Sequence, residues 1–161
     1  MQIISDAQMQ TSRNYMQHGN ISVFSHCVMV AYYSIKFSEF FHLKVDRKSL
    51  IRGALLHDYF LYDWHTVKIK EINGLHGFVH PVIAAENANK RFSLSKKEYD
   101  IISCHMWPLT ITRIPKSLEG WLVSIADKYC SLLETFRIAP YSNENLDTFY
   151  SSPSNHPTCP N

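Results

Sequence analysis

An ionisable pair, His57 and Asp58, interrupts the most apolar helical run of the chain, in the stretch "GALLHDYFLYDWH". The apolar residues 54–56 precede the pair as expected core, and an aromatic cluster follows it. An unpaired carboxylate in such surroundings costs several kcal/mol in desolvation, unless a proton, a partner or a metal ion compensates its charge. A fold for this chain must therefore bring compensation to residue 58.

Apolar residues recur at helical spacing, and the chain contains only 5 glycines and almost no alternating β-branched runs. This pattern predicts an all-α fold. The helices are expected over about residues 3–17, 22–42 and 46–58, from Pro81 onward, from Ser95 to shortly before Pro108, and over about residues 117–136.

Capping residues support several of these helix starts. Ser22 and Asp46 are plausible N-caps, because their side-chain oxygens can accept hydrogen bonds from the first turn. Ser95 and Glu98 form a capping box. Pro81 fits the first position of a helix, where its missing N–H costs nothing.

The length of 161 residues suits one domain, which we expect to cover residues 1–139. The remaining residues, 140–161, are rich in Ser, Asn and Pro and are expected to form a loosely ordered tail. With 45% hydrophobic and 19% charged residues, the composition excludes a disordered chain. A formal net charge of +2 without a dense Lys/Arg block argues against binding to a nucleic-acid duplex.

Four scattered cysteines without a C-x-x-C motif favour free thiols in a reducing compartment over a disulfide framework or a structural zinc site. The N-terminus lacks the pattern of a signal peptide. No apolar run approaches the roughly 18 residues that span a bilayer. We therefore expect a cytoplasmic protein that does not enter a membrane.

Several other histidines and one aspartate are also expected to face inward. Taken alone, His26 is more often a satisfied core histidine than a ligand, and Asp127 is as well explained by a buried hydrogen bond. His105 alone can cap the end of its helix, and His80 is a weak signal by itself. Together with His57 and Asp58, these residues come from five helical segments.

The combined set of imidazole nitrogens and carboxylate oxygens suits Fe, Mn or Zn better than a carboxylate-rich Ca or Mg site. Metal coordination would also remove the cost of leaving two inward aspartates unpaired, which is large against a domain stability of about 5–15 kcal/mol. We interpret the His57–Asp58 pair as metal ligands.

The order His26, His57–Asp58, Asp127 resembles the H…HD…D signature of the HD-domain metal-dependent phosphohydrolases. The motifs "HGFVHP", "IISCHMWP" and "SIADKY" resemble features of the two-metal branch of that superfamily. The longer pattern resembles a little-studied bacterial HD family, and the likeness covers about residues 13–136. The resemblance implies an HD-domain helical bundle.

Carried onto this sequence, the resemblance implies a first metal held by His26, His57, Asp58 and Asp127. Asp58 would bridge to a second metal that His80 and His105 also hold. Two divalent transition ions are expected, Fe or Mn first, with Zn, Ni, Co or Mg as alternatives. A hydroxide bridging such ions could attack phosphorus without a Ser or Cys nucleophile.

The expected activity is therefore hydrolysis of a small phosphate ester, preferably a nucleotide, as a monoesterase or diesterase. Asp58 would act in catalysis, and Lys128 and Arg52 are candidates for contacting phosphate oxygens, although both also fit as surface charges. The alternative is a catalytically quiet HD domain that senses a nucleotide or a metal.

Further residues near the motifs are weaker candidates for substrate contacts. Some of the aromatic side chains are expected to line a pocket wall, and the rest to pack in the core. His76 offers an alternative ligand pair with His80 if its helix begins before Pro81. The additional candidates are Tyr59, Tyr62, Trp64 and Trp107, the histidines His18, His65 and His76, and the basic residues Arg113 and Lys116.

Overall fold

A computed structural model of the chain describes residues 3–66 and 75–146. These residues are mainly helical, with one small antiparallel hairpin, so the all-α prediction is confirmed. The elements are α1 (Ala7–Thr11), a 3-10 turn η1 (Ser12–Asn14), β1 (Met16–His18), β2 (Ile21–Ser22), α2 (Val23–Phe40), α3 (Arg47–Leu56), α4 (His76–Phe92), α5 (Lys96–Cys104) and α6 (Leu118–Thr135).

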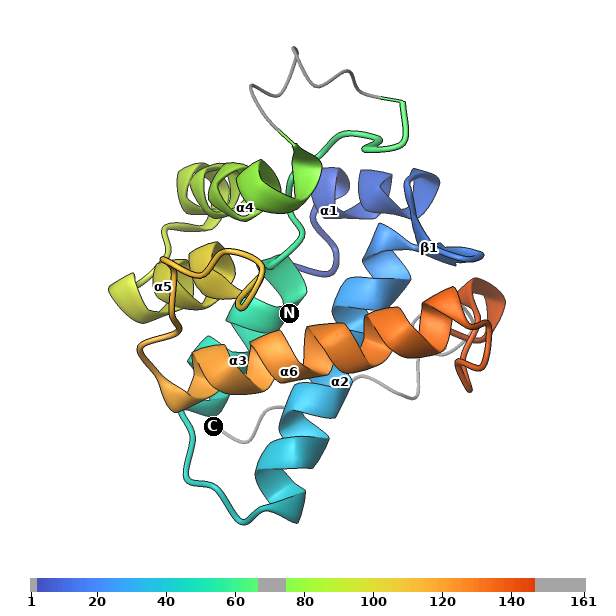
Figure 1. Cartoon of the computed structure of the whole chain (residues 1–161). Coiled ribbons are helices and arrows are strands. Elements are labelled where there is room, and N and C mark those ends of the chain that lie inside the picture. The colour runs from blue at the N-terminus through green and yellow to red at the C-terminus, as the bar shows by residue number, and fades with distance from the viewer. Residues whose placement is uncertain (1–2, 67–74, 147–161) are drawn as a thin grey trace.

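Helix α3 lies between the long helices α2 and α6 on one side and the shorter helix α5 on the other (Figure 1). Helix α4 packs against α5, and the hairpin lies near the start of α2 and the end of α6. At Gly53 of α3, an added Cβ would lie 2.6 Å from Ile101 Cγ2 of α5, so these two helices are in close contact. This packing places the C-terminal end of α3, and therefore residues 57 and 58, at the centre of the domain.

The predicted helix caps are present. Ser22 and Asp46 accept hydrogen bonds from backbone N–H groups in the first turns of α2 and α3. Ser95 and Glu98 form the complete capping box at the start of α5, and Ser117 caps α6. Asp6 likewise caps α1, so side-chain hydrogen bonds mark the start of five of the six α-helices labelled in the described residues.

The predicted helix over residues 3–17 is wrong. The chain forms the short α1, then η1, and then turns back in the β1–β2 hairpin. The hairpin turn contains Gly19 in a left-handed conformation, with φ at 59°, and the Val23 N–H donates to the Tyr15 carbonyl at 2.8 Å. The backbone hydrogen bonds of residues 15–22 thus join β1 to β2 and to the start of α2, and they do not continue the first helix.

The predicted helix start at Pro81 is also wrong, because α4 begins at His76 and contains Pro81 in its interior. A proline at this position removes one backbone hydrogen bond from the helix. Within the preceding turn, His80 Nδ1 donates to the His76 carbonyl at 2.8 Å, and α4 packs along α5. Tertiary packing therefore offsets the local cost of the proline.

The first residues of the predicted tail pack against the domain and are not loosely ordered. Tyr141 is buried, and its hydroxyl donates to Glu134 Oε1 at 2.6 Å. Asn143 donates to the Asn20 carbonyl, and Leu146 packs against the core. The rest of the predicted tail, residues 147–161, lies outside the described part of the chain.

Asp6 connects α1 to α4. Its carboxylate caps α1 and accepts two hydrogen bonds from Arg91 and one from the Tyr59 hydroxyl. Burial alone would raise the pKa of Asp6, yet the hydrogen bonds from Arg91 and from the Met9 N–H lower it below 3.8. A carboxyl group with a lowered pKa stabilises the fold above its unfolded pKa, and this contribution is lost as the pH falls through its folded pKa.

We therefore expect Asp6→Ala to lower the free energy of unfolding by about 1 kcal/mol at pH 7, as removal of an N-cap typically does. The difference from the wild type should shrink between pH 5 and pH 3, as the wild-type carboxylate takes up a proton. Urea denaturation at several pH values measures both quantities. Glu86→Ala, at an exposed position of α4, is the control and should show neither effect.

Candidate metal centre

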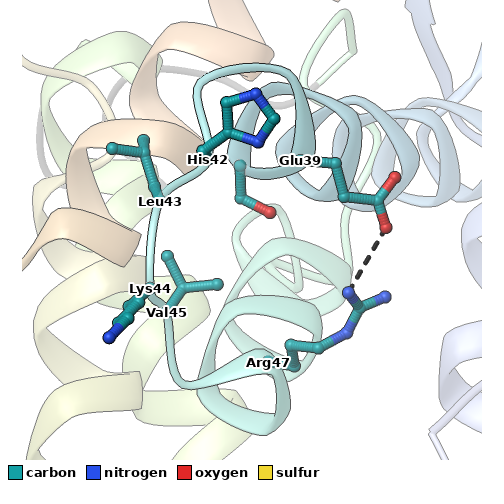
Figure 2. Close-up of a pocket in the computed structure, with 7 residues that line it drawn as sticks. Glu39, His42, Leu43, Lys44, Val45 and Arg47 are labelled. Carbon is teal, nitrogen blue, oxygen red and sulfur yellow. Dashed lines mark hydrogen bonds and ion pairs between the residues drawn. The ribbon is translucent and has the colours of Figure 1, made fainter.

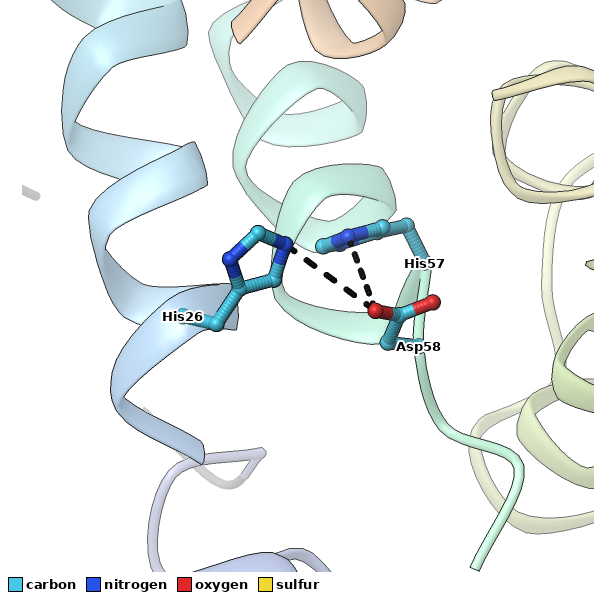
Figure 3. A group of neighbouring side chains, drawn as sticks. All are labelled: His26, His57 and Asp58. Carbon is cyan, nitrogen blue, oxygen red and sulfur yellow. Dashed lines mark ion pairs between the residues drawn. The ribbon is translucent and has the colours of Figure 1, made fainter. Parts of the chain in front are cut away.

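Three ligand candidates converge from two helices. His26 lies in the first turns of α2, and His57 and Asp58 follow the last residue of α3. Figure 3 shows the three side chains pointing toward one another. His26 Nε2 lies 4.0 Å and His57 Nε2 lies 3.4 Å from Asp58 Oδ2. These donor atoms lie close enough together to hold one ion.

Asp127 joins this group from α6. Its Oδ1 lies 3.1 Å from His26 Nε2 and 3.7 Å from His57 Nε2. Both aspartates and both histidines are buried. Asp127 therefore contacts both histidines of this group from a third helix.

A second group shares Asp58. His80 Nε2 and His105 Nε2 lie 3.3 Å and 3.5 Å from Asp58 Oδ1, and 2.9 Å from each other. His80 comes from α4 and His105 from the end of α5, and both are buried. One oxygen of Asp58 thus faces His26 and His57, and the other oxygen faces His80 and His105. In this arrangement Asp58 could hold two cations, one with each of its oxygens.

The hydrogen bonds of the four Nδ1 atoms determine which nitrogen of each imidazole keeps a free lone pair. His57 Nδ1 lies 2.7 Å from the Ala54 carbonyl, and His105 Nδ1 lies 2.7 Å from the Ile102 carbonyl. His80 Nδ1 likewise faces a carbonyl, and His26 Nδ1 faces a carboxylate oxygen of Glu134 at 2.8 Å.

A carbonyl or carboxylate can only accept a hydrogen bond, so each Nδ1 carries a proton. The neutral tautomer of each ring then has its lone pair on Nε2, which points into the centre. A histidine that binds metal through one ring nitrogen usually donates a hydrogen bond from the other nitrogen to a carbonyl or carboxylate, as these four do.

The electrostatics of the centre favour bound positive charge. Burial alone would lower the pKa of His26, but Glu134 and Asp127 raise it to about 10. Burial would raise the pKa values of Asp58 and Asp127, yet the surrounding imidazoles hold both well below their ordinary value. Burial and the neighbouring His57 and His80 hold the pKa of His105 well below 6.5. The carboxylates therefore remain ionised and attract cations to the imidazoles.

Two buried atoms of the centre lack hydrogen-bond partners in the part of the chain that the structure describes, as expected for a site that holds a ligand. His57 Nε2 and Asp58 Oδ1 are buried and have no hydrogen-bond partner among the described residues. Leaving such atoms unpaired costs roughly 1–3 kcal/mol each, and more for a charged group. A transition metal ion would satisfy both, and the donor set of imidazoles and carboxylates suits such ions.

A family model described as HD domain matches residues 23–132. The chain belongs to the HD domain family. HD domains form a superfamily of metal-dependent phosphohydrolases. The resemblance to this superfamily that the sequence predicted is confirmed. No curated protein and no solved structure matched the chain.

The two basic candidates lie in different surroundings within the HD domain. Lys128 Nζ donates to the His105 carbonyl and lies 3.1 Å from Asp127 Oδ2, so it borders the ligand cluster. Arg52 instead donates to Glu98 Oε1 at 2.6 Å and to the Phe92 carbonyl at 3.0 Å. The structure does not bring Arg52 to the ligands, because Glu98 of α5 neutralises its charge and holds its guanidinium.

The aromatic candidates are divided between core and site. The Tyr59 hydroxyl bonds to Asp6, and Trp107 packs against Trp121 at a ring distance of 4.7 Å, so both serve packing. The Tyr62 hydroxyl lies 3.0 Å from His76 Nδ1. His76 stacks on the ligand candidate His80, with ring centroids 4.4 Å apart.

The remaining candidates lie around this stack or away from it. Trp64 stacks on His76 and contacts the ring of His65, whereas His18 contacts the rings of His26 and Trp64. Lys116 is exposed and lies near Asp100, outside the cluster. His18 and His76 therefore contact ligand candidates through their rings, and Trp64 packs behind them.

Two residues that touch the ligands were not predicted from the sequence. Gln17 of β1 donates from Nε2 to Asp58 Oδ2 at 2.6 Å. Glu134 of α6 accepts from His26 Nδ1 and from the Tyr141 hydroxyl. The position of Glu134, seven residues after Asp127 on the same helix, is a periodicity signal that could have identified it. No comparable local signal marks Gln17, because it lies in the hairpin.

A surface pocket lies far from this centre, at the connection between α2 and α3 (Figure 2). It is lined by Ser38, Glu39, His42, Leu43, Lys44, Val45 and Arg47, and Glu39 pairs with Arg47 at 3.3 Å. Glu39 and His26 are thirteen residues apart on α2, which is roughly 20 Å at 1.5 Å per residue. None of the six ligand candidates lines this pocket.

Glu134 orients His26, and this role can be tested. We expect Glu134→Gln to weaken metal binding by about 10–100-fold, because a neutral amide does not increase the basicity of the His26 imidazole as a carboxylate does. The glutamine also has a single acceptor oxygen for the two donors, His26 Nδ1 and the Tyr141 hydroxyl, that the carboxylate of Glu134 now serves. Titration of the metal-free protein against a chromophoric chelator measures the affinity. Glu86→Gln on the exposed face of α4 is the matched control, and equal affinity in the two variants would contradict the role.

Proposed function

We propose that this HD domain is a metal-dependent hydrolase of a small phosphate ester, preferably a nucleotide. The observation that carries the proposal is the bridging position of Asp58, whose two oxygens face two separate pairs of imidazoles. Membership of the HD domain family supports the same reaction class. We infer two divalent transition ions, with Fe or Mn preferred.

His26, His57, Asp58 and Asp127 would hold one ion, and Asp58, His80 and His105 the other. Two such ions would supply Lewis-acid polarisation of phosphoryl oxygens and activation of a water molecule. The chain itself would align the ester and keep the ligands dry, since all six ligand side chains are buried. No Ser or Cys nucleophile is needed for this chemistry.

Lys128 is the cation best placed to contact the phosphate. Its Nζ borders Asp127 and the His105 carbonyl, and its side chain is 36% exposed. An ammonium group with three donors can keep these two partners and offer a further proton to a phosphate oxygen. Lys128 would thus neutralise charge that the metal ions do not reach.

We place this activity in a reducing compartment, as in the bacterial cytoplasm. Cys27, Cys104 and Cys130 are all buried free thiols, as is usual for cytosolic proteins. Cys159 lies outside the described residues. Within the described chain, no helix combines the length and apolar character needed to cross a bilayer.

Two measurements on the purified protein test the function. Metal analysis should find between one and two equivalents of a transition metal. A panel of phosphate esters that includes p-nitrophenyl phosphate and bis-p-nitrophenyl phosphate should show turnover when Fe²⁺ or Mn²⁺ is supplied. Bound metal without turnover on any ester would overturn the hydrolase and favour a sensor.

A further inference from the structure

Gln17 presents an unused hydrogen-bond acceptor at the metal centre. The residue is only 7% exposed, and its Nε2 donates to Asp58 Oδ2 at 2.6 Å. Its Oε1 is buried and has no hydrogen-bond partner among the described residues. The amide cannot be turned around, because Oε1 would then face the carboxylate of Asp58, which only accepts.

The backbone around Gln17 is held firmly in place. An added Cβ at Gly19, whose φ is 59°, would lie 2.7 Å from the carbonyl oxygen of Glu134, so the hairpin is in close contact with α6. The Asn143 side chain also donates to the Asn20 carbonyl at 2.9 Å. Both contacts fix the hairpin, so the Gln17 amide is preorganised against Asp58.

The chemistry around Oε1 limits what it can bind. A buried acceptor is costly when unpaired, so the bound state should supply a donor. Phosphate oxygens act mainly as acceptors near neutral pH, so they cannot fill this role. A neutral amide is also too weak a base to remove a proton from an attacking water. The partners left are a water molecule and a neutral donor on the alcohol half of the ester, and the experiment below distinguishes them.

The position of Oε1 limits where that donor can lie. Oε1 and Nε2 are bonded to the same carbon, and Nε2 contacts Asp58, so Oε1 lies beside the proposed metal bridge. A hydroxyl that reaches it must be close to the phosphate.

We propose that Gln17 is a specificity-determining residue, which selects phosphate esters that carry a hydroxyl group next to the esterified carbon. This inference rests on the proposed function. Gln17 Oε1 accepts a hydrogen bond from that hydroxyl, while Nε2 keeps Asp58 in its bridging orientation.

The test compares two small esters, 2-hydroxypropyl phosphate and propyl phosphate, on the metal-loaded protein. The wild type should prefer the hydroxylated ester about tenfold in kcat/KM, the scale of one hydrogen bond. Gln17→Met keeps the length of the side chain but loses both the acceptor Oε1 and the donor Nε2 that contacts Asp58. Its rate on both esters can therefore fall, but the ratio of kcat/KM between the two esters should drop to about one, and this ratio is independent of metal content because both rates are measured on the same preparation.

Met16→Ala is the matched control, because Met16 is the neighbouring residue of β1 and is 40% exposed. It should retain the preference. If Gln17→Met does not fold, Gln17→Asn takes its place, since the shorter amide withdraws its oxygen from the substrate.

The outcomes separate this proposal from the proposed function. If neither ester is hydrolysed, dissociation constants from calorimetry replace the rates. A hydroxyl preference in binding then supports Gln17, while the full panel of phosphate esters decides whether the protein is a hydrolase. An equal fall on both esters, which keeps the hydroxyl preference, would show that Gln17 acts only through Asp58 or the attacking water and would overturn the proposal. A wild type that binds neither ester, or binds both equally, also overturns it.

Discussion

Asp58→Asn should remove both metal ions and lower the phosphohydrolase rate at least about a thousandfold. The asparagine side chain has the same shape but no negative charge. Its NH₂ group would face one of the two pairs of imidazole lone pairs, where Asp58 presents an oxygen. Because the two ion positions share this single carboxylate, the substitution should affect both of them. Metal analysis and steady-state kinetics measure the two losses.

The fold of Asp58→Asn should survive. The asparagine amide can donate to a histidine Nε2 in place of the lost charge. The metal-free variant should therefore still unfold cooperatively, although it loses the stability that the imidazoles confer on the ionised carboxylate. Glu39→Gln is the control, since it removes one negative charge at the far end of α2. A variant with full metal content, or with activity near that of the wild type, would contradict the bridging role.

Removal of metal should lower the Tm of the wild type by about 10 °C. Ions present at a thousandfold excess over Kd stabilise the native state by about 4 kcal/mol. A domain of this size changes its Tm by roughly 2–4 °C per kcal/mol. Thermal unfolding before and after treatment with a chelator measures the shift. Addition of Fe²⁺ or Mn²⁺ should restore the Tm, whereas Ca²⁺ should not, because imidazole is a poor ligand for it.

The stabilisation by metal should grow between pH 6 and pH 8. Protons compete with metal for the imidazoles, and although burial acts in the opposite direction, Glu134 and Asp127 raise the pKa of His26 to about 10. A higher pH removes this competition and strengthens metal binding. Asp58→Asn is the control here, and its Tm should be insensitive to the chelator. A wild-type Tm that the chelator leaves unchanged would contradict metal binding at the centre.

Features determined by short stretches of sequence were predicted well. The caps at Ser22, Asp46 and Ser95 act over three residues, and the helical spacing of apolar residues is itself local. The six ligand candidates were recognisable because buried ionisable residues are costly and because their order resembles the HD signature. The structure places all six in contact.

Other features depend on packing between distant segments. Arg52 was a candidate for phosphate binding, but Glu98, 46 residues away, holds it elsewhere. The start of α4 before Pro81 and the hairpin in place of a longer first helix also follow from contacts with α5, α2 and α6. Local propensity predicted different structures for these segments, and tertiary contacts outweighed it.

The amino-acid sequence by itself determined the helical class and most helix starts, and it identified the candidate ligand side chains, because these depend on residue type and short-range spacing. Only the tertiary structure decided which oxygen of Asp58 faces which histidines, and that Gln17 and Glu134 support them. Those contacts join residues 41 and 108 positions apart. Their geometry depends on how whole helices pack, which no local pattern records.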